Sequence, residues 1–357
     1  MKNPSTLAHR TLLLLGTLLV AGTLAGCTPP ARQRKNVKDL TPQEKRDYIE
    51  AVLKLKSTPS PYDSRLSWYD QFVDFHKQVY YFRPQGKNYQ IGHNSPTFLV
   101  WHRKFLLMYE QALREVSGKD ITLPYWDWSD KASTEAVFRE DFMGGDGEPE
   151  HHAVIDGPFR KGAWELKVFP YLNSQEVINN QAPPEENTIP YLTRKLGTEA
   201  ELEPIASDLK ACLGLDQYDA YPWDEKADRM VSFRNCLEGW GHDPKDNHLH
   251  NTAHVWVGGM FQEGEQMVSG GMAAVDTSPN DPVFFLHHAN VDRLWAMWEQ
   301  SHGNAYVPNG DGNEGWNPGD SLYPFDQDKY HEDPWVKLYG NTVGDMLDVS
   351  KLDYEYR

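Results

Sequence analysis

"DPVFFLHHANVDRLWAMWE" occupies residues Asp281–Glu299, and its apolar side chains follow the pattern of a buried helix. One stripe is spaced by three and four residues, which places its members on a single face. These members are Phe284, His288, Val291, Trp295 and Trp298. His287 lies roughly 100° further round the same helix. The stretch therefore predicts a helix that begins after Asp281-Pro282 and carries an imidazole on its apolar face.

Three further histidines lie on or just before predicted helices. His76 shares an apolar face in a helix expected over about 64–82, and His102 does so in a helix over about 97–117. His93 comes nine residues before His102. A single histidine on such a face is more often a core residue with a satisfied hydrogen bond than a ligand. His76 taken alone therefore indicates little.

The stretch "HLHNTAHVWVGGMF" at residues 248–261 adds a pair of histidines that are four residues apart. On a helix that begins at about 248, His250 and His254 lie one turn apart on the same side. His248 points roughly the other way, so we interpret it as a non-ligand. A pair with this spacing is weak evidence for a metal site until other ligands converge with it.

The rest of the chain predicts a mainly α fold, in which a four-helix bundle is surrounded by long loops. An N-terminal helix opens at "LTPQEK", where Thr41 and Glu44 form a capping box around Pro42. A further helix is expected over about 225–240, whereas residues 140–190 are rich in Gly, Pro, Asn and acidic side chains. No strong alternating strand pattern and no tandem repeat occurs in the sequence.

Four predicted helices, or their approaches, thus present histidines from apolar faces, and burying so many imidazoles without partners is costly. A metal centre explains them together, since neutral imidazole suits copper, zinc, iron or nickel. No Glu-x-x-His pair accompanies them, which argues against a carboxylate-bridged di-iron bundle. No Cys or Met lies in these motifs, which argues against a blue-copper site. A shell of imidazoles alone fits a pair of copper ions that binds dioxygen.

The composition argues against nucleic acid as a partner. The 357 residues include 52 acidic and 35 basic side chains, which give a net charge of −17. The two remaining cysteines after the N-terminal region, Cys212 and Cys236, can pair in an oxidising compartment if their Cα atoms are close enough. The sequence alone does not decide whether this disulfide forms.

The N-terminus resembles an export signal, because two basic residues precede a short apolar stretch. The stretch ends in "LAGC", which resembles the lipobox of a bacterial lipoprotein. We expect a lipoprotein-type signal peptide over 1–26, a tether over 27–36 and one domain over 37–357. The protein is then exported and anchored in the bacterial cell envelope by a lipid on Cys27, which attaches it to a membrane.

Four stretches resemble the tyrosinase family of type-3 copper proteins, which includes the polyphenol oxidases. They are "GHNSPTFLVWHRKFLLMYE" at 92–110, "LPYWDWSD" at 123–130, "HNTAHVWVGG" at 250–259 and "SPNDPVFFLHHANVDRLW" at 278–295. The resemblance runs from about Arg34 to the end of the sequence and implies two copper ions. It implies that one ion is held by His76, His93 and His102. The other ion is then held by His250, His254 and His288, with His287 as the alternative to His288.

Two details of the resemblance point to the bacterial short form of the family. Many fungal and plant members carry a cysteine two residues before the second ligand, cross-linked to that ligand, and this chain has Ile91 there. The Tyr-x-Tyr motif that closes the family's core is present as Tyr354-Glu355-Tyr356, and Arg34 is expected to pack against it. Because the sequence stops after this motif, we expect no C-terminal shielding domain.

The resemblance implies copper-dependent oxidation of phenols by dioxygen, with ortho-hydroxylation of monophenols and oxidation of o-diphenols to o-quinones. Glu238 in "FRNCLEGW" resembles the family's water-holding glutamate, and Asn251 resembles its hydrogen-bonding partner. Together they are expected to orient a water that takes the phenolic proton. The segment "GWGHDPKDNHL" between Glu238 and His250 is longer than expected of short bacterial relatives. This segment either bulges outward and leaves Glu238 in place, or it moves the Glu238 carboxylate away from the copper site.

The main alternative is a catechol oxidase or an o-aminophenol oxidase that lacks monophenolase activity. Hemocyanin-like oxygen binding uses the same copper pair and is the less favoured alternative. Phenolic small molecules and dioxygen are the expected partners in every enzymatic interpretation. A helper protein that loads copper is also compatible with the sequence.

Overall fold

The computed structural model describes residues 31–84, 87–202, 205–224, 226, 228–239, 248–264, 266–306, 313–330 and 333–357. The expected signal peptide, Cys27, residues 28–30 of the expected tether and His242 all lie outside these ranges. Residues Arg32–Arg357 form one compact unit. Within the described residues, no helix combines the length and apolar character needed to cross a membrane.

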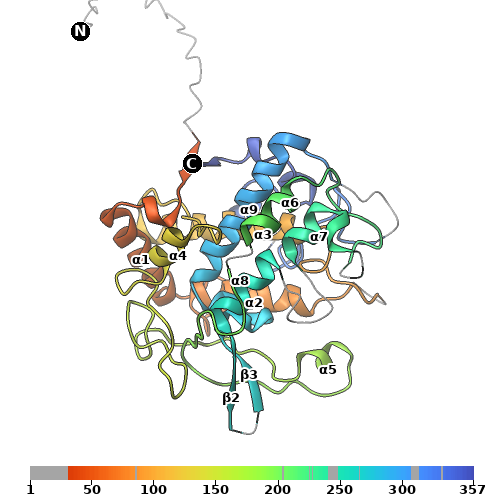
Figure 1. Cartoon of the computed structure of the whole chain (residues 1–357). Coiled ribbons are helices and arrows are strands. Elements are labelled where there is room, and N and C mark those ends of the chain that lie inside the picture. Colours follow the sequence, from red (N-terminus) through yellow and green to blue (C-terminus); the bar gives the residue numbers. More distant parts are fainter. Residues whose placement is uncertain are drawn as a thin grey trace, which may run out of the picture. The chain divides into compact units, whose positions relative to one another are not determined.

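Four helices meet at the centre of this unit, as Figure 1 shows. They are α2 (Trp68–Tyr81), α3 (Phe98–Ser117), α8 (Leu249–Gly258) and α9 (Val283–His302). All four match helices expected from the sequence, and the mainly α fold with a central helical bundle is confirmed. The histidines singled out from the sequence lie on these helices, apart from His93, which lies on the loop before α3.

Aromatic side chains hold the central helices together. Phe72 on α2 contacts Phe105 on α3 with ring centroids 5.5 Å apart. Tyr109 on α3 stacks on Phe285 of α9. All four of these rings are fully buried. Buried aromatic rings contribute a large apolar area as well as directional ring contacts. The relative positions of α2, α3 and α9 therefore rest on a densely packed apolar core.

The N-terminal helix α1 (Pro42–Ser57) begins as its sequence predicts. The Thr41 hydroxyl accepts from the Glu44 N–H at 3.2 Å, and the Glu44 carboxylate accepts from the Thr41 N–H at 2.8 Å. Helix α3 ends at Gly118, which adopts a left-handed conformation with φ of 68°. A glycine takes this conformation without the steric cost that a Cβ would add.

The helix expected over 225–240 is wrong in extent. Among the described residues of this range, α7 (Phe233–Glu238) is the α-helix that forms, after a 3-10 turn at Arg229–Val231. Ser232 has extended backbone angles, which separate the turn from the helix. The other short helices are α4 (Lys131–Val137), α5 (Ser174–Ile178), α6 (Ile205–Leu213) and α10 (Pro334–Lys337).

Within the described residues, four short strands form in stretches for which no strand is predicted from the sequence. β2 (Met260–Glu263) and β3 (Gln266–Ser269) form an antiparallel hairpin, seen at the bottom of Figure 1. β1 (Arg32–Arg34) pairs in parallel with β4 (Tyr354–Tyr356). Strands of three or four residues are too short to show an alternating pattern.

A buried network of charged side chains joins the β1–β4 pair to α3 and α9. Arg34 packs over the Tyr354 ring at 3.6 Å, as expected, and its guanidinium donates to Glu110 of α3 at 2.9 Å. Asp292 of α9 accepts from Arg34, Arg103, Tyr354 and Tyr356. Arg103 directly follows His102, and Asp292 lies one turn after His288. The network therefore fixes the two helices close to their histidines.

Candidate metal centre

Two groups of buried histidines lie in the middle of the bundle. The first histidine group contains His76 of α2, His93 of the loop before α3, and His102 of α3. Its three rings are between 1% and 4% exposed. In each group, one potential ligand atom per histidine lies within 4.8 Å of those of the other members. The structure thus brings together three side chains that are up to 26 positions apart in the sequence.

The second histidine group contains four members, on two helices. They are His250 and His254 of α8, with His287 and His288 of α9. The His250 ring lies 5.0 Å from His287 and 4.9 Å from His288 between centroids. The two groups adjoin each other, because the rings of His102 and His288 stack at 4.2 Å. Among the described residues, these are the clusters of three or more such side chains suited to a metal ion.

Backbone carbonyls fix four of the imidazoles through Nδ1. The carbonyls belong to Asp276 for His76, Phe98 for His102, Glu238 for His250 and Met272 for His254, at 2.8 to 3.1 Å. A carbonyl oxygen only accepts, so each Nδ1 carries the proton and each Nε2 presents a lone pair. This arrangement sets the tautomer of metal-binding histidines in many sites.

The two Nε2 atoms of His250 and His254 lie 3.1 Å apart. Because both Nδ1 atoms carry the protons, two lone pairs face each other at this distance and no hydrogen bond joins them. Two nitrogens bound to one metal ion at about 2.0 Å are themselves about 3 Å apart. The pair is therefore shaped for a shared cation.

Other ring nitrogens in the centre also lack partners. Nε2 of His76 and of His102, Nδ1 of His93, and both nitrogens of His287 and His288 have no hydrogen bond within the described part of the chain. Leaving buried polar atoms unpaired costs free energy unless a ligand satisfies them. The donor set is nitrogen only, which suits copper in both of its common oxidation states.

Burial lowers the pKa of every histidine in the two groups. For His76 the pKa falls to about 3, and for His254 to about 4, with loss of solvent as the largest cause in both. The pKa values of the other five also fall well below the usual value, chiefly through burial and then through neighbouring histidines. At neutral pH the rings are uncharged, which is the form that binds a metal ion.

A cavity of about 170 Å³ opens onto the two groups. His93 of the first group and His250 and His254 of the second line it. The cavity is also lined by Glu238 and Asn251, the two residues predicted to orient a water. Nδ2 of Asn251 has no hydrogen-bond partner within the described residues. Val255 is half-buried and lines the same cavity.

The Glu238 side chain is 0% exposed and accepts hydrogen bonds from the loop before α3 and from α7. The Asn94 N–H donates to Oε1 at 2.7 Å, and Nη1 of Arg234 donates to Oε2 at 2.8 Å. Asn94 has a φ of 48°, an uncommon conformation for a residue other than glycine. Since Asn94 follows His93 and the Glu238 carbonyl holds His250, this carboxylate is tied to both histidine groups.

The long segment before His250 leaves Glu238 at the cavity. The His248 N–H donates to the Gly239 carbonyl at 3.0 Å, so the two ends of the segment are joined. Gly239 has a φ of 81°, and a Cβ there would lie 1.8 Å from the His248 carbonyl oxygen. Glycine is therefore required directly after Glu238. The residues between, 240–247, lie outside the described ranges.

His248, His152 and the two cysteines are not members of either histidine group. Nδ1 of His248 lies 2.8 Å from the Asp208 carboxylate, and the His152 ring packs on Phe261 at 4.6 Å. Cys212 and Cys236 are buried and free, so the structure contains no disulfide between them. Sequence reasoning missed Arg234 and Asn94, although Arg234 lies four residues before Glu238 and thus one helical turn away.

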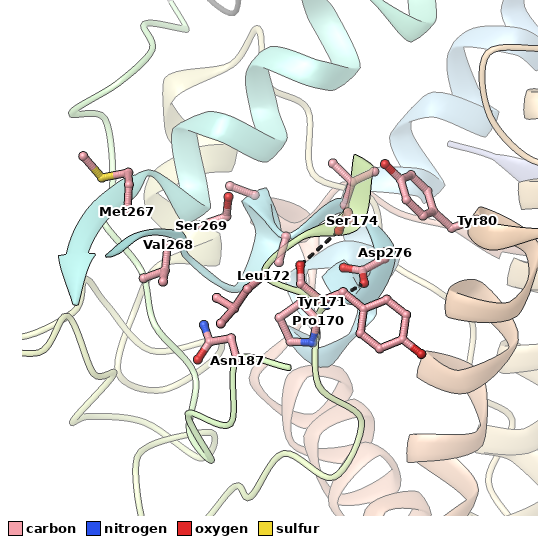
Figure 2. Close-up of a pocket in the computed structure, with 13 residues that line it drawn as sticks. Tyr80, Pro170, Tyr171, Leu172, Ser174, Asn187, Met267, Val268, Ser269 and Asp276 are labelled. Atoms are coloured by element: carbon pink, nitrogen blue, oxygen red, sulfur yellow. Dashed lines mark hydrogen bonds between the residues drawn. The ribbon is translucent and has the colours of Figure 1, made fainter. Parts of the chain in front are cut away.

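A second cavity of about 240 Å³ adjoins the first, and Ala273 and Val275 line both. Figure 2 shows Tyr80 and Asp276 among its lining residues, and a hydrogen bond from the Tyr171 N–H to the Asp276 carboxylate. The Asp276 carbonyl is the one that holds His76. The wall of this cavity therefore also positions a member of the first histidine group.

Comparisons with known proteins agree with this geometry. The family model for the common central domain of tyrosinase matches residues 66–301. A tyrosinase from Streptomyces glaucescens is 39% identical over 279 residues, which cover 77% of this chain and 85% of that protein. Grixazone synthase from Streptomyces griseus is 38% identical over 291 residues, covering 77% and 87%.

A solved structure shares the fold. The structure of a variant polyphenol oxidase from Thermothelomyces thermophila superposes with a TM-score of 0.61 at 23% identity, covering 91% of this chain and 88% of that one. The matched region 66–301 contains both histidine groups and Glu238. This chain belongs to the tyrosinase family, an oxidoreductase family whose members use a dinuclear type-3 copper centre.

Proposed function

We propose that this chain hydroxylates monophenols at the ortho position and oxidises o-diphenols to o-quinones, with dioxygen as the oxidant. The observation that carries the proposal is the cavity in which Glu238 and Asn251 lie beside His93, His250 and His254. A site that only oxidised diphenols would have less need of a proton acceptor next to the metal. Membership of the tyrosinase family supports the broader class of copper-dependent phenol oxidation.

We assign His76, His93 and His102 to one copper ion. The second ion is assigned to His250, His254 and His288. His288 is preferred to His287 because its ring stacks on His102 of the first group at 4.2 Å. The His287 ring instead packs against Trp128 at 5.0 Å, away from the first group. A ligand of a paired centre is expected on the side that faces the other ion.

The bound copper pair supplies the redox chemistry by which dioxygen is reduced. The residues of this chain supply binding and proton transfer. A phenol in the cavity must lose its hydroxyl proton, and the pKa of a free phenol is about 10. Glu238 accepts from a water, Asn251 donates to it or accepts from it, and the water takes the proton from the phenolic oxygen. The net reaction converts a monophenol and dioxygen into an o-quinone and water.

A catechol oxidase or o-aminophenol oxidase is the second candidate, since the same histidines serve it. One assay separates the candidates. The copper-loaded protein is given a monophenol under air with a trace of o-diphenol as primer, while quinone absorbance and copper content are followed. Two copper ions per chain with quinone from the monophenol support the proposal. Quinone from the diphenol alone would support the alternative, and no quinone with reversible oxygen binding would support a hemocyanin-like role.

We also propose that the protein is exported and anchored in the cell envelope through a lipid on Cys27. The "LAGC" motif and the apolar stretch before it support this proposal. Intact-mass measurement of the membrane fraction should show loss of residues 1–26 and a mass increase from acyl chains. The variant Cys27→Ser should lack that increase. We also propose that a helper protein loads the copper. Copper uptake by the purified protein without any helper would count against this.

A further inference from the structure

The buried Arg234 side chain donates hydrogen bonds to two carboxylates, one of which lines the cavity. Its Nε and Nη2 donate to the two oxygens of Asp219, each at 2.8 Å, and its Nη1 donates to Glu238 at 2.8 Å. The side chains of all three residues are 0% exposed. A planar guanidinium that donates to both oxygens of one carboxylate is fixed in orientation as well as in position.

Asp219 is itself fixed. Its Oδ1 accepts from the Ala220 N–H at 2.8 Å and from the Ser232 hydroxyl at 3.3 Å. The neighbouring Tyr218 hydroxyl donates to the Pro96 carbonyl at 2.7 Å, on the loop that carries His93. Tyr218, next to Asp219, is therefore bonded to the loop whose Asn94 N–H donates to the other oxygen of Glu238.

The charges in this cluster do not cancel. One guanidinium faces two carboxylates, so the buried triad carries a net charge of −1 when all three groups are ionised. Burying charges is costly, and a pairing of Arg234 with Asp219 alone would be balanced. Glu238 is the member of this triad that lines the cavity.

We propose that Arg234, oriented by Asp219, is a positioning residue for monophenol hydroxylation: it holds the Glu238 carboxylate in one orientation at the cavity that Glu238 and Asn251 line, where this carboxylate accepts a hydrogen bond from the water. This inference rests on the proposed function. Arg234 holds Oε2 from one side and the Asn94 N–H holds Oε1 from the other, which leaves the carboxylate no freedom to rotate. The phenolic proton then passes to a water whose place is set before the substrate arrives.

The effect is expected to be selective for monophenols. A catechol loses its first proton more readily than a simple phenol, because its second hydroxyl donates a hydrogen bond to the phenolate oxygen. Diphenol oxidation therefore depends less on a well-placed proton acceptor. If Glu238 is free to rotate, kcat for a monophenol falls, while kcat for the matching o-diphenol changes little.

The test compares Arg234→Lys and Asp219→Asn with the matched control Arg194→Lys. Arg194 is also buried and donates to both oxygens of one carboxylate, that of Asp281, at 2.7 and 2.8 Å. The measured quantity is the ratio of kcat for a monophenol to kcat for its o-diphenol, taken on one copper-loaded preparation. This ratio cancels differences in folded fraction and in copper loading. The unfolding temperature of each copper-free variant is recorded beside it.

We expect the ratio to fall about tenfold in Arg234→Lys and in Asp219→Asn, on the scale of a mispositioned proton acceptor. Arg194→Lys should lower the unfolding temperature by a similar amount and leave the ratio unchanged. Equal ratios in Arg234→Lys and Arg194→Lys would overturn the inference and leave the proposed function standing. A wild-type protein that oxidises diphenols alone would overturn the proposed function itself.

Discussion

The first histidine group draws its members from two helices and a loop, whereas the second draws four members from two helices. In the first group the loop member, His93, adjoins Asn94, whose N–H holds Glu238. In the second group His250 is held by the Glu238 carbonyl. Helices thus carry most of the proposed ligands in both groups, and the loop connects the proposed metal centre to the carboxylate. The second group has four histidines where three are proposed as ligands, and Glu238 is joined to both groups.

The largest expected effect removes one ligand from either group. His76→Gln and His254→Gln should each lower bound copper from two ions to about one per chain. Oxidation of o-diphenols should fall at least ~10³-fold in both, since the reaction needs both ions. Copper content by atomic emission and quinone formation check this. If either variant kept two copper ions with near-normal activity, the assignment of its group would be wrong.

The next prediction distinguishes His287 from His288, because the second group has four histidines and three are proposed as ligands. His288→Asn should lose the second copper ion and its activity, as a ligand variant does. His287→Asn should keep two copper ions and lose activity by about tenfold or less, because its ring packs on Trp128 and supports α9. The two variants change the same residue type at adjacent buried positions, so each serves as the other's control. The reverse result would assign His287 as the ligand.

Glu238→Gln tests the link between the groups. The amide keeps the size of the side chain and removes the negative charge, so monophenol hydroxylation should fall about 10²-fold. Oxidation of the o-diphenol should fall much less, and the copper content should stay at two ions per chain. Loss of copper together with both activities would instead assign Glu238 a structural role.

The smallest effect concerns pH and is common to both groups. In the copper-free protein, burial lowers the histidine pKa values, to about 3 for His76 and about 4 for His254. The unfolded chain takes up protons below a pKa of about 6.5 and the folded chain does not, so stability falls as pH drops below that value. From pH 7 to pH 6 the loss is roughly 0.7 kcal/mol per histidine.

Differential scanning calorimetry of the copper-free protein should therefore show an unfolding temperature that falls by several degrees between pH 7 and pH 6. Copper-loaded protein should unfold at a higher temperature than copper-free protein at both pH values, because the metal ion binds the folded, uncharged imidazoles. An unfolding temperature that rose with acidification would contradict the burial of these histidines in the copper-free state.

The sequence predicted the central helices well, because their apolar stripes are long and their histidines lie on them. Helix α3 was expected over about 97–117 and spans Phe98–Ser117. The motifs of the sequence also indicate the six proposed ligands and Glu238. Helix spacing and family motifs carry this information within single stretches of chain.

The support of the centre was not predictable in the same way. The carbonyls that hold His76 and His254 belong to Asp276 and Met272, and any residue type supplies such a group. The Asn94 N–H that holds Glu238 is likewise a backbone group, placed there by a φ of 48°. Backbone contacts between distant segments leave no pattern in side-chain identity. The helix expected over 225–240 failed for a related reason, since the extended Ser232 is set by its surroundings.

The β1–β4 pair has a consequence for how the protein is made. Arg34 and Tyr356 are 322 positions apart, and the hydrogen bond between them belongs to the buried network on α3 and α9. During synthesis, Arg34 emerges first, and its tyrosine partners emerge only after every histidine ligand. Contacts of such long range form late in folding. We therefore expect the bundle to be locked only after Tyr354 and Tyr356 have been synthesised, later than all of the proposed copper ligands.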